Sequence, residues 1–455
     1  MKGGAATSVA ERLSQRFSIL PSGADLLSLY EVDGLRPSAV LQPADAPEIS
    51  ELLRFATAER LAVIPCGGRT KLHIGAPPAR YDFALDMSRM NRVLAFDPRD
   101  LTLGVEPGIS YRALSEILAA EKQFLPLAPP FAGRATIGGI LAADSASPLR
   151  QAYGGPRDFV LGMEFVNGDG VVSKSGGRVV KNVTGYDLHK VLIGSLGTLA
   201  VITRVNFKTF PLPPASAVFV AEFASYAGAH AFCGAIVASP LSPQILELVS
   251  PEAGKLLAGV NLSTEQWSVV IAAAGYESVV ARHARDLQSF ATQCNAAHFA
   301  RYENASSDLL SSTLAAAVAE FPQSVRQSSS AATLFRVAAL PAAAPALVER
   351  IRAIALRCEI PHAVVVRPYG LIYAALLPAS NNEAAVASLA SAAEEVFLVS
   401  TELGARARIE SAPLALKQRI SVWGPAREDF ELMSRVKKVF DPAGVLSPNR
   451  FTGGI

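Results

Sequence analysis

The sequence has few cysteines and few histidines, and their spacing excludes the common metal-binding motifs. The four cysteines, Cys66, Cys233, Cys294 and Cys358, lie far apart, so there is no CxxC pair to hold zinc or an iron–sulfur cluster. The six histidines include no pair at metal-ligand spacing, and we therefore expect no metal site. Isolated cysteines of this kind are typical of reduced thiols in a cytoplasmic protein.

The sequence also lacks a strong excess of charge and a plausible membrane span. Its 42 Lys and Arg balance 40 Asp and Glu, which gives no reason to expect nucleic acid or an anionic membrane surface as a partner. The uncharged run Phe223–Leu246 contains Pro240 and Pro243, so we interpret it as a buried helix, a turn and the start of a strand. The N-terminus shows no basic and then apolar signal pattern. We expect a cytoplasmic chain with no membrane span of its own, which reaches the inner face of a membrane only through its partners.

Familiar motifs for nucleotide binding and hydrolysis are missing. The chain has no GxGxxG, no Walker A loop, no HExxH and no GxSxG. An ordinary Rossmann dinucleotide site is therefore not expected, although the chain contains 33 glycines. With 455 residues, half of them hydrophobic, the chain can build two or three domains with large cores.

The order of predicted elements indicates an α+β protein. After an outer helix within the first 30 residues, Asp45 is placed to cap a helix, and Leu61–Pro65 reads as a buried strand. Helix and strand patterns then alternate up to a proline cluster at 211–214, which fits no helix or strand interior and marks a domain boundary. Beyond it, alanine-rich helices lie between apolar strands, a pattern that favours an antiparallel sheet covered on one side by helices.

Three glycine-rich clusters are the informative part of the sequence. In Cys66–Lys71, adjacent glycines can take φ > 0 and form a backbone nest for an anion, with basic side chains adding charge, although a tight turn with solvated basic residues has the same pattern. Pro129–Ala143 allows close approach of a flat or phosphorylated ligand, or of a helix to a sheet. Lys181–Leu188 and Gly194–Ile202 set polar side chains and glycines between apolar stretches. Together the clusters favour one binding site.

These clusters resemble the motifs of the FAD-binding oxidoreductases of the vanillyl-alcohol oxidase (PCMH-type) family. Five segments match in the family's order: Pro65–Lys71, Ala135–Ala143, Tyr153–Gly162, Gly194–Thr203 and Phe440–Arg450. Within the family, VKNVTGYDL at 180–188 and the FPLPP exit at 210–214 are most similar to the glycolate oxidase FAD-binding subunits. That resemblance implies a small 2-hydroxy acid such as glycolate as substrate, and a larger flavin subunit and an iron–sulfur subunit as partners.

The resemblance implies domain limits and a set of cofactor residues. Residues 1–214 would form an FAD-binding domain of two α/β subdomains, 215–400 a cap with an antiparallel sheet covered by helices, and 401–455 a segment that returns to the FAD domain. The residues implied to contact FAD are Cys66, Gly67, Gly68, Arg69, Thr70, Lys71, Pro130, Thr136, Ile137, Gly138, Gly139, Ala142, Lys181, Gly185, Tyr186, Asp187, Ile202 and Arg450.

Departures from the family pattern bear on how FAD is held. Some members bind FAD covalently through a histidine directly after the diglycine of this loop. Arg69 stands there in this chain, so we expect non-covalent FAD, with His73 the one residue that could contradict the expectation. Leu196 replaces the glutamate of the family's GSEG segment, so a carboxylate that could lie near the flavin is gone.

The catalytic residues are harder to assign from sequence, because two family histidines are missing. The 2-hydroxy-acid dehydrogenases of the family hold a metal and substrate with histidines in segments that correspond to 367–373 and 402–404, where this chain has none. Arg367, Tyr369 and Tyr373 are the candidates for contacting a substrate carboxylate, and His362 is the reserve base. Two alternatives stay open: a stand-alone D-lactate-type dehydrogenase, and a non-catalytic flavoprotein scaffold.

Overall fold

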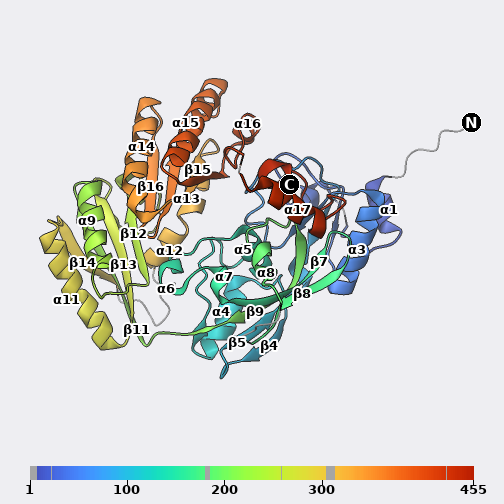
Figure 1. Cartoon of the computed structure of the whole chain (residues 1–455), viewed down its shortest axis with the longest axis horizontal. Helices are drawn as coiled ribbons and strands as arrows, with labels where there is room; N and C mark the ends of the chain where they lie inside the picture. Colours follow the sequence, from blue (N-terminus) through green and yellow to red (C-terminus); the bar gives the residue numbers. More distant parts are fainter. Residues whose placement is uncertain (1–7, 22, 180–184, 258, 304–312, 427) are drawn as a thin grey trace, which may run out of the picture.

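The computed structural model describes residues 8–21, 23–179, 185–257, 259–303, 313–426 and 428–455. An N-terminal domain with sheets of three, five and two strands lies beside a second domain built on one large sheet (Figure 1). The second domain is the predicted cap, and the mixed helix and sheet architecture confirms the predicted α+β class.

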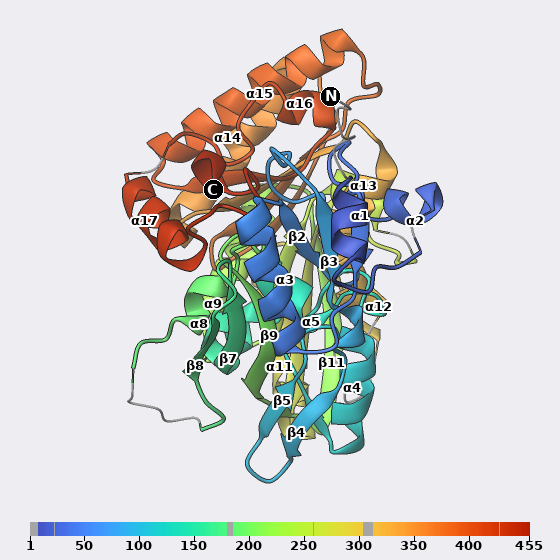
Figure 2. The same cartoon turned by 90° about the vertical axis from the view of Figure 1, so that its right-hand side faces the viewer.

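The first subdomain is a three-stranded parallel sheet in the order β1-β3-β2 (Figure 2). Helix α3 begins where Asp45 accepts a hydrogen bond from the Glu48 N–H at 2.9 Å, and it ends at Arg60 in the left-handed conformation. In place of the single predicted outer helix, the chain starts with two short ones. The elements are α1 (Val9–Ser14), α2 (Ala24–Ser28), β1 (Ala39–Leu41), α3 (Ala46–Glu59), β2 (Val63–Cys66), β3 (Phe83–Asp86) and the 3-10 helix η1 (Met87–Arg89).

The second subdomain is a five-stranded antiparallel sheet in the order β4-β5-β9-β7-β8, with a small β10-β6 pair beside it. Its core packs α4 and α5 against the sheet, and α5 lies at the centre of the molecule, next to the cap (Figure 1). The elements are β4 (Val93–Asp97), β5 (Thr102–Val105), α4 (Tyr111–Ala120), β6 (Gln123–Phe124), α5 (Ile137–Ala143), α6 (Arg150–Tyr153), α7 (Pro156–Phe159), β7 (Val160–Asn167), β8 (Val172–Gly176), α8 (His189–Leu192), β9 (Ala200–Lys208) and β10 (Phe210–Pro211).

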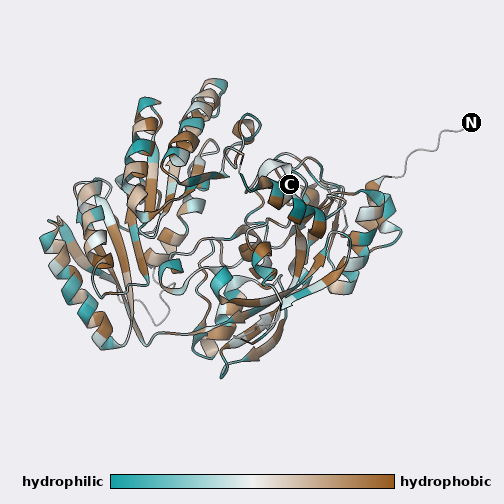
Figure 3. Ribbon diagram, in the orientation of Figure 1, coloured by the Kyte–Doolittle hydropathy of each residue, from teal (hydrophilic) through white to brown (hydrophobic). Residues whose placement is uncertain are grey.

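The cap is an eight-stranded antiparallel sheet in the order β14-β11-β13-β12-β16-β17-β15-β18. Four long helices (α9, α11, α14 and α15) cover its outer face, and their buried apolar residues pack into the core between the helices and the sheet (Figure 3). The other face meets the first domain and also packs three short helices, α10, α12 and α13. The elements are β11 (Ala215–Phe223), α9 (Tyr226–Val237), β12 (Ile245–Val249), α10 (Pro251–Leu256), β13 (Trp267–Gly275), α11 (Glu277–Gln293), β14 (His298–Glu303), α12 (Thr313–Ala319), α13 (Phe321–Ser328), β15 (Thr333–Ala338), η3 (Pro341–Ala343), α14 (Ala344–Arg357), β16 (His362–Arg367), β17 (Leu371–Leu376), α15 (Glu383–Glu402) and β18 (Arg406–Ser411).

The cap extends beyond the predicted limit at residue 400. Strand β18 pairs antiparallel with β15, so the chain leaves the cap sheet only after Ser411. The chain then passes through α16 (Leu414–Lys417) and α17 (Phe430–Phe440) and ends in η4 (Thr452–Gly454). The returning segment joins the first sheet, because the Ser447 N–H donates to the Val63 carbonyl at 2.8 Å. The Phe223–Leu246 run forms the end of β11, α9 and the start of β12, as the sequence predicts.

By length and composition, α15 is the one helix in the described ranges that could cross a membrane. It packs instead on α14 and β18 and buries one side in the cap core.

Candidate functional site

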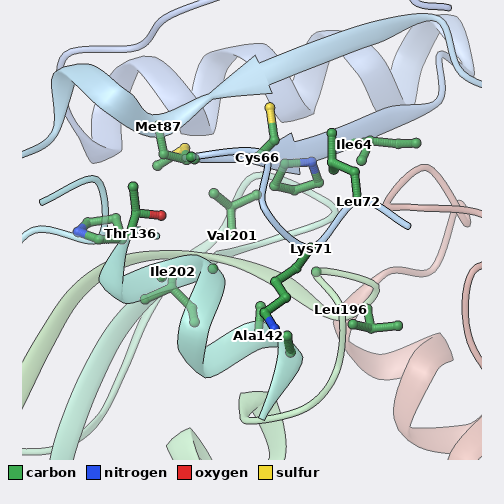
Figure 4. A pocket seen from close by; sticks show the side chains of 18 of the residues that line it. Ile64, Cys66, Lys71, Leu72, Met87, Thr136, Ala142, Leu196, Val201 and Ile202 are labelled. Atoms are coloured by element: carbon green, nitrogen blue, oxygen red, sulfur yellow. The ribbon is translucent and has the colours of Figure 1, made fainter. Parts of the chain in front are cut away.

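Most of the glycine-rich segments identified in the sequence contribute residues to one cavity of about 880 Å³. Three segments form its walls: the loop after β2, helix α5 and the turn that leads into β9 (Figure 4). The lining residues are Ile64, Pro65, Cys66, Gly67, Gly68, Arg69, Thr70, Lys71, Leu72, Met87, Pro107, Thr136, Gly138, Gly139, Ala142, Ala143, Ser195, Leu196, Gly197, Ala200, Val201, Ile202 and Arg450.

The diglycine of the first loop serves close packing and not a left-handed turn. A Cβ at Gly67 would lie 2.1 Å from the Thr136 hydroxyl oxygen, and one at Gly68 would lie 1.6 Å from the Arg134 carbonyl oxygen. The residue with positive φ is Arg69, at 58°, so the expectation that the glycines supply this conformation was wrong. Glycine is needed here because the loop and the segment before α5 touch backbone to backbone.

Gly139 of α5, in contrast, lines the cavity, and a side chain there would have one close neighbour. A Cβ there would meet only the Thr136 hydroxyl oxygen, at 3.3 Å. Helix backbone without a side chain therefore forms part of the cavity wall, which is the cradle that a flat or extended cofactor needs. On the opposite side, Lys71 extends across the cavity toward Ala142, whereas the Cys66 sulfur points away from it (Figure 4).

Most of the predicted cofactor residues line this cavity, and a minority do not. The lining includes Cys66, Gly67, Gly68, Arg69, Thr70, Lys71, Thr136, Gly138, Gly139, Ala142, Ile202 and Arg450. Ile137 is fully buried in the neighbouring core, and Pro130 is buried outside the lining. Gly185, Tyr186 and Asp187 lie at the surface, where Tyr186 is 89% exposed, and Lys181 lies outside the described residues. The segment around Tyr186 does not reach the cavity because it follows β8, the outer strand of its sheet.

Sequence reasoning passed over several apolar wall residues. Ile64, Leu72, Met87 and Val201 lie in ordinary apolar patterns, so no local signal distinguishes them from core residues. Leu196 also lines the cavity, in the left-handed conformation with φ 54°.

Two family models match the chain. The FAD binding domain matches residues 37–176, and the C-terminal domain of FAD linked oxidases matches residues 424–451. The chain therefore carries segments that match the FAD binding domain and the C-terminal domain of FAD linked oxidases. Both matched segments contribute to the cavity just described, through the loop after β2, α5 and Arg450.

Curated relatives fall among flavoenzymes of hydroxy acids. The chain is 31% identical to the glycolate oxidase subunit GlcD of Bacillus subtilis over 213 residues. This aligned segment covers 47% of this chain and 45% of that protein. It is 34% identical to the glycolate oxidase subunit GlcE of Escherichia coli K12 over 36% of this chain and 47% of that protein. A mitochondrial D-lactate dehydrogenase (cytochrome) of Arabidopsis thaliana is 31% identical over 58% of this chain and 46% of that protein. The matches span about half the length of these relatives.

Solved structures support the fold over almost the whole chain. p-Cresol methylhydroxylase aligns with a TM-score of 0.75 at 14% identity and covers 98% of this chain and 97% of its own. A 4-ethylphenol oxidase from Gulosibacter chungangensis aligns with a TM-score of 0.71 at 18% identity, over 93% and 90% of the two chains. At this identity the likeness shows a shared PCMH-type fold and no more.

A second, larger cavity of about 1610 Å³ lies between the cap and the FAD domain. The first cavity is here called the FAD cavity, because residues of the matched FAD binding domain form much of its wall. The second cavity adjoins it, because Ala143 lines the FAD cavity and the next residue, Asp144, lines the second cavity. Its walls come from β15, α15, β18 and the C-terminal segment. The lining residues are Asp144, Gly194, Arg336, Ala338, Phe397, Thr401, Gly404, Ala405, Arg406, Ala407, Arg408, Trp423, Pro425, Ala426, Glu428, Met433, Phe451 and Thr452.

Two guanidinium groups stand where the cavities meet. Arg336 donates to the Asp144 carbonyl oxygen at 3.0 Å and to its carboxylate at 3.4 Å. Arg408 lies over the Trp423 ring at 5.8 Å, and its buried Nε and Nη2 have no hydrogen-bond partner among the residues that the structure describes. The nearest carboxylate oxygen, on Glu410, is 3.7 Å away. Arg408 thus presents charge and unused donors of the kind that bind a carboxylate.

Lys71 lines the FAD cavity, but the charged groups that influence its ammonium belong to the cap. Burial lowers the pKa of its ammonium, Glu410 opposes that change, and Arg336 and Arg408 add to it. For Glu410, burial raises the pKa, but Arg408, Arg336 and Lys71 outweigh burial and lower it. The sequence-based expectation placed the Lys71 charge beside a bound anion of the loop, whereas its charged neighbours are residues of the cap.

The predicted substrate residues of the cap lie elsewhere. Arg367 is 1% exposed and pairs with the buried Glu247 at 2.7 Å, because β16 lies beside β12 in the sheet. Tyr373 lies against Arg367, with 5.2 Å from the guanidinium carbon to the ring centroid, and the Tyr369 hydroxyl is 3.5 Å from the Ser147 carbonyl oxygen. None of these three lines either cavity, so a substrate carboxylate has no access to Arg367 in this structure.

His362 is also remote from the site. It begins β16, about 17 Å along the strand from Arg367, and burial lowers its pKa. Its electrostatic neighbours are Glu252 and Arg352, and it lines neither cavity. His362 therefore lies at the opposite end of β16 from Arg367 and away from both cavities, where it cannot serve as the predicted reserve base.

His73 lies after the cofactor loop. Its ring nitrogen contacts the Arg326 guanidinium, and burial holds its pKa well below the usual value, with Arg326 adding to the effect. His73 is absent from the lining of the FAD cavity. In the described ranges no three His, Cys, Asp or Glu side chains gather as a possible metal site.

Proposed function

We propose that this chain is the FAD-binding subunit of a glycolate oxidase-type complex that oxidises glycolate or a similar 2-hydroxy acid. The observation that carries the proposal is the junction of the two cavities: a glycine-walled cavity opens beside a cavity with arginine side chains on its wall. The likeness to both the GlcD and the GlcE subunits supports a multi-subunit assembly.

In this proposal the chain's own residues bind and orient. The loop 67–71, the glycines of α5 and Arg450 would hold FAD without a covalent bond, and FAD when bound supplies the acceptor for a hydride. Arg408 and Arg336 would bind the substrate carboxylate, which fixes the hydroxyl-bearing carbon relative to the cofactor. The Trp423 ring against Arg408 restricts that guanidinium and limits its hydration.

Removal of the substrate's hydroxyl proton is the step for which the described residues of the isolated subunit offer no histidine base. Within the described residues, neither cavity is lined by a histidine or contains a cluster of metal ligands. General-base help is worth roughly 10²–10⁴-fold in rate. We therefore propose that the chain works beside a larger flavin subunit and an iron–sulfur subunit, in the cytoplasm or at the inner membrane face through them.

The test compares the chain alone with the chain co-expressed with the proteins encoded beside it. FAD-loaded samples are assayed with glycolate and D-lactate and a dye as electron acceptor. The proposal expects turnover well below the ordinary enzyme rate of about 10 per second for the isolated chain and a gain in the complex. Ordinary turnover by the isolated chain would favour the stand-alone dehydrogenase. No oxidation in either sample would favour the scaffold.

Substrate binding is tested separately from turnover. Oxalate, a non-oxidisable carboxylate analogue, is titrated into FAD-loaded protein while the flavin absorbance is followed. Arg408→Gln should weaken oxalate binding by roughly 10- to 100-fold, the value of a charge-assisted hydrogen bond. Arg350→Gln is the matched control, because Arg350 pairs with Glu402 on the cap surface. Equal weakening by both variants, or by neither, would remove Arg408 from the binding site.

A further inference from the structure

A segment ahead of the matched FAD domain packs behind the cofactor loop. The family match begins at residue 37, and residues 23–36, here called the N-terminal strap, precede it and include α2. Tyr30 and Val32 of the strap are buried in a small apolar cluster with Ile64 and Cys66, which line the FAD cavity. The strap therefore touches the back of the wall whose front faces the cofactor.

The first polar contact of the strap holds the start of the loop. The Tyr30 hydroxyl donates to the Asp86 carboxylate at 2.6 Å and accepts from the Arg69 guanidinium at 3.0 Å. That guanidinium also lies over the Tyr30 ring at 4.5 Å and 3.6 Å from the Asp86 carboxylate. Arg69 has a φ of 58°, which is unfavourable for a long side chain. Such a conformation persists only where its surroundings determine it, and Tyr30 and Asp86 do so.

The second polar contact holds the end of the loop. The Asp33 carboxylate accepts from the buried ammonium of Lys417, at 2.8 and 3.0 Å, and from the guanidinium of Arg450 at 3.1 Å. Lys417 also donates to the His73 carbonyl at 2.6 Å. Arg450 donates to the Leu72 carbonyl at 2.6 Å.

These cations tie the loop to distant parts of the chain. Lys417 ends α16, which leads out of the cap, and Arg450 lies in the C-terminal segment and lines the FAD cavity. Asp33 compensates both charges, which are 2% and 4% exposed. Without Asp33, two neighbouring buried cations would lack a compensating charge, which destabilises the arrangement of the residues that they contact at the end of the loop.

We propose that the N-terminal strap is a positioning element for FAD binding. Tyr30 sets the start of the loop through Arg69, and Asp33 sets its end through Lys417 and Arg450. The loop is then ordered before the cofactor arrives, so binding does not bear the entropy of arranging it. The proposal concerns cofactor loading and goes beyond the proposed oxidation of hydroxy acids, which can fail while this inference stands.

The test measures FAD affinity of the full-length apoprotein by quenching of flavin fluorescence. Tyr30→Phe keeps the ring and removes one hydroxyl, and Asp33→Asn keeps the shape and tolerates positive φ. Each should weaken FAD binding at least about 10-fold. Glu31→Gln is the matched control in the same segment, because the Glu31 carboxylate pairs with the exposed Arg36, and it should bind FAD within about twofold of the parent.

A double-variant comparison separates positioning from general stability. Arg69→Gly accepts positive φ without help but also removes a side chain of the FAD-binding loop, so it is its own reference: adding Tyr30→Phe to Arg69→Gly should change FAD affinity by no more than about threefold. The thermal midpoint of each apoprotein is measured alongside. Parent-like affinity of Tyr30→Phe would overturn the proposal. So would a loss of similar size when Tyr30→Phe is added to Arg69→Gly, since the Tyr30 hydroxyl would then act without Arg69. If Asp33→Asn fails to fold, the Tyr30 and Arg69 variants still decide.

Discussion

Gly139→Ala should separate the stability of the apoprotein from its capacity to bind FAD. The glycine lies inside α5, where alanine is favoured by about 1 kcal/mol because it restricts the unfolded chain. The added methyl would lie 3.3 Å from the Thr136 hydroxyl oxygen, so the Thr136 side chain must shift by a few tenths of an ångström, and part of that gain should remain. For a domain of this size the midpoint of the apoprotein should rise by about 2–4 °C.

The same methyl enters the cavity that the cofactor occupies in our proposal. Overfilling a well-packed contact costs about 1–3 kcal/mol, which corresponds to a roughly 5- to 150-fold loss of FAD affinity. Calorimetry of the apoprotein and a fluorescence titration with FAD measure the two effects. Gly139→Val should lose FAD more completely.

Two other glycines serve as controls. Gly234 lies in α9, and a Cβ added there would meet nothing within 4 Å, so Gly234→Ala should stabilise the protein without changing FAD affinity. Gly68→Ala places a Cβ 1.6 Å from the Arg134 carbonyl oxygen and should lower the midpoint even without FAD. Parent-like FAD affinity of Gly139→Ala would refute the position of the cofactor against α5.

Three further outcomes follow from the buried charges and the cofactor loop. Arg367→Met should destabilise the protein by about 3 kcal/mol in urea unfolding, because it leaves Glu247 buried and unpaired, and the double variant with Glu247→Leu should recover most of this loss. Burial raises the pKa of Glu247 to about 7 from an ordinary 4.5, so the folded state retains a proton that the unfolded state loses. Its contribution to stability should therefore fall by roughly 3 kcal/mol as pH rises from about 4.5 to 7, and Glu247→Gln should abolish that decline. Acid precipitation should release the flavin into the supernatant in both the parent and His73→Ala, and yellow colour in the parent's pellet would show a covalent bond.

Much of the cofactor wall could be predicted from sequence because its chemistry is local. The sequence shows a strand followed by Gly67 and Gly68, and a helix start with Gly138 and Gly139. Glycines at such positions indicate that the backbone lies close to another group. The proline cluster at 211–214 likewise marks the passage to the cap, since proline is excluded from regular interiors. What the glycines approach is not local, and the contact of Gly68 with Arg134 emerges only in the fold.

The charged residues of the cap were decided by tertiary structure. Strand register places Arg336 beside both Tyr373 and Arg408, three residues from separate strands, and the packing of the cap on α5 brings Asp144 to Arg336. Arg367 resembles a ligand-binding arginine in sequence, but the neighbouring strand β12 supplies Glu247 and closes it off. The strap is equally invisible, because Tyr30 and Asp33 gain their partners from residues 39 to 417 positions away. Local conformation can be read from the chain, whereas the partner of a buried charge depends on which segments the fold brings together.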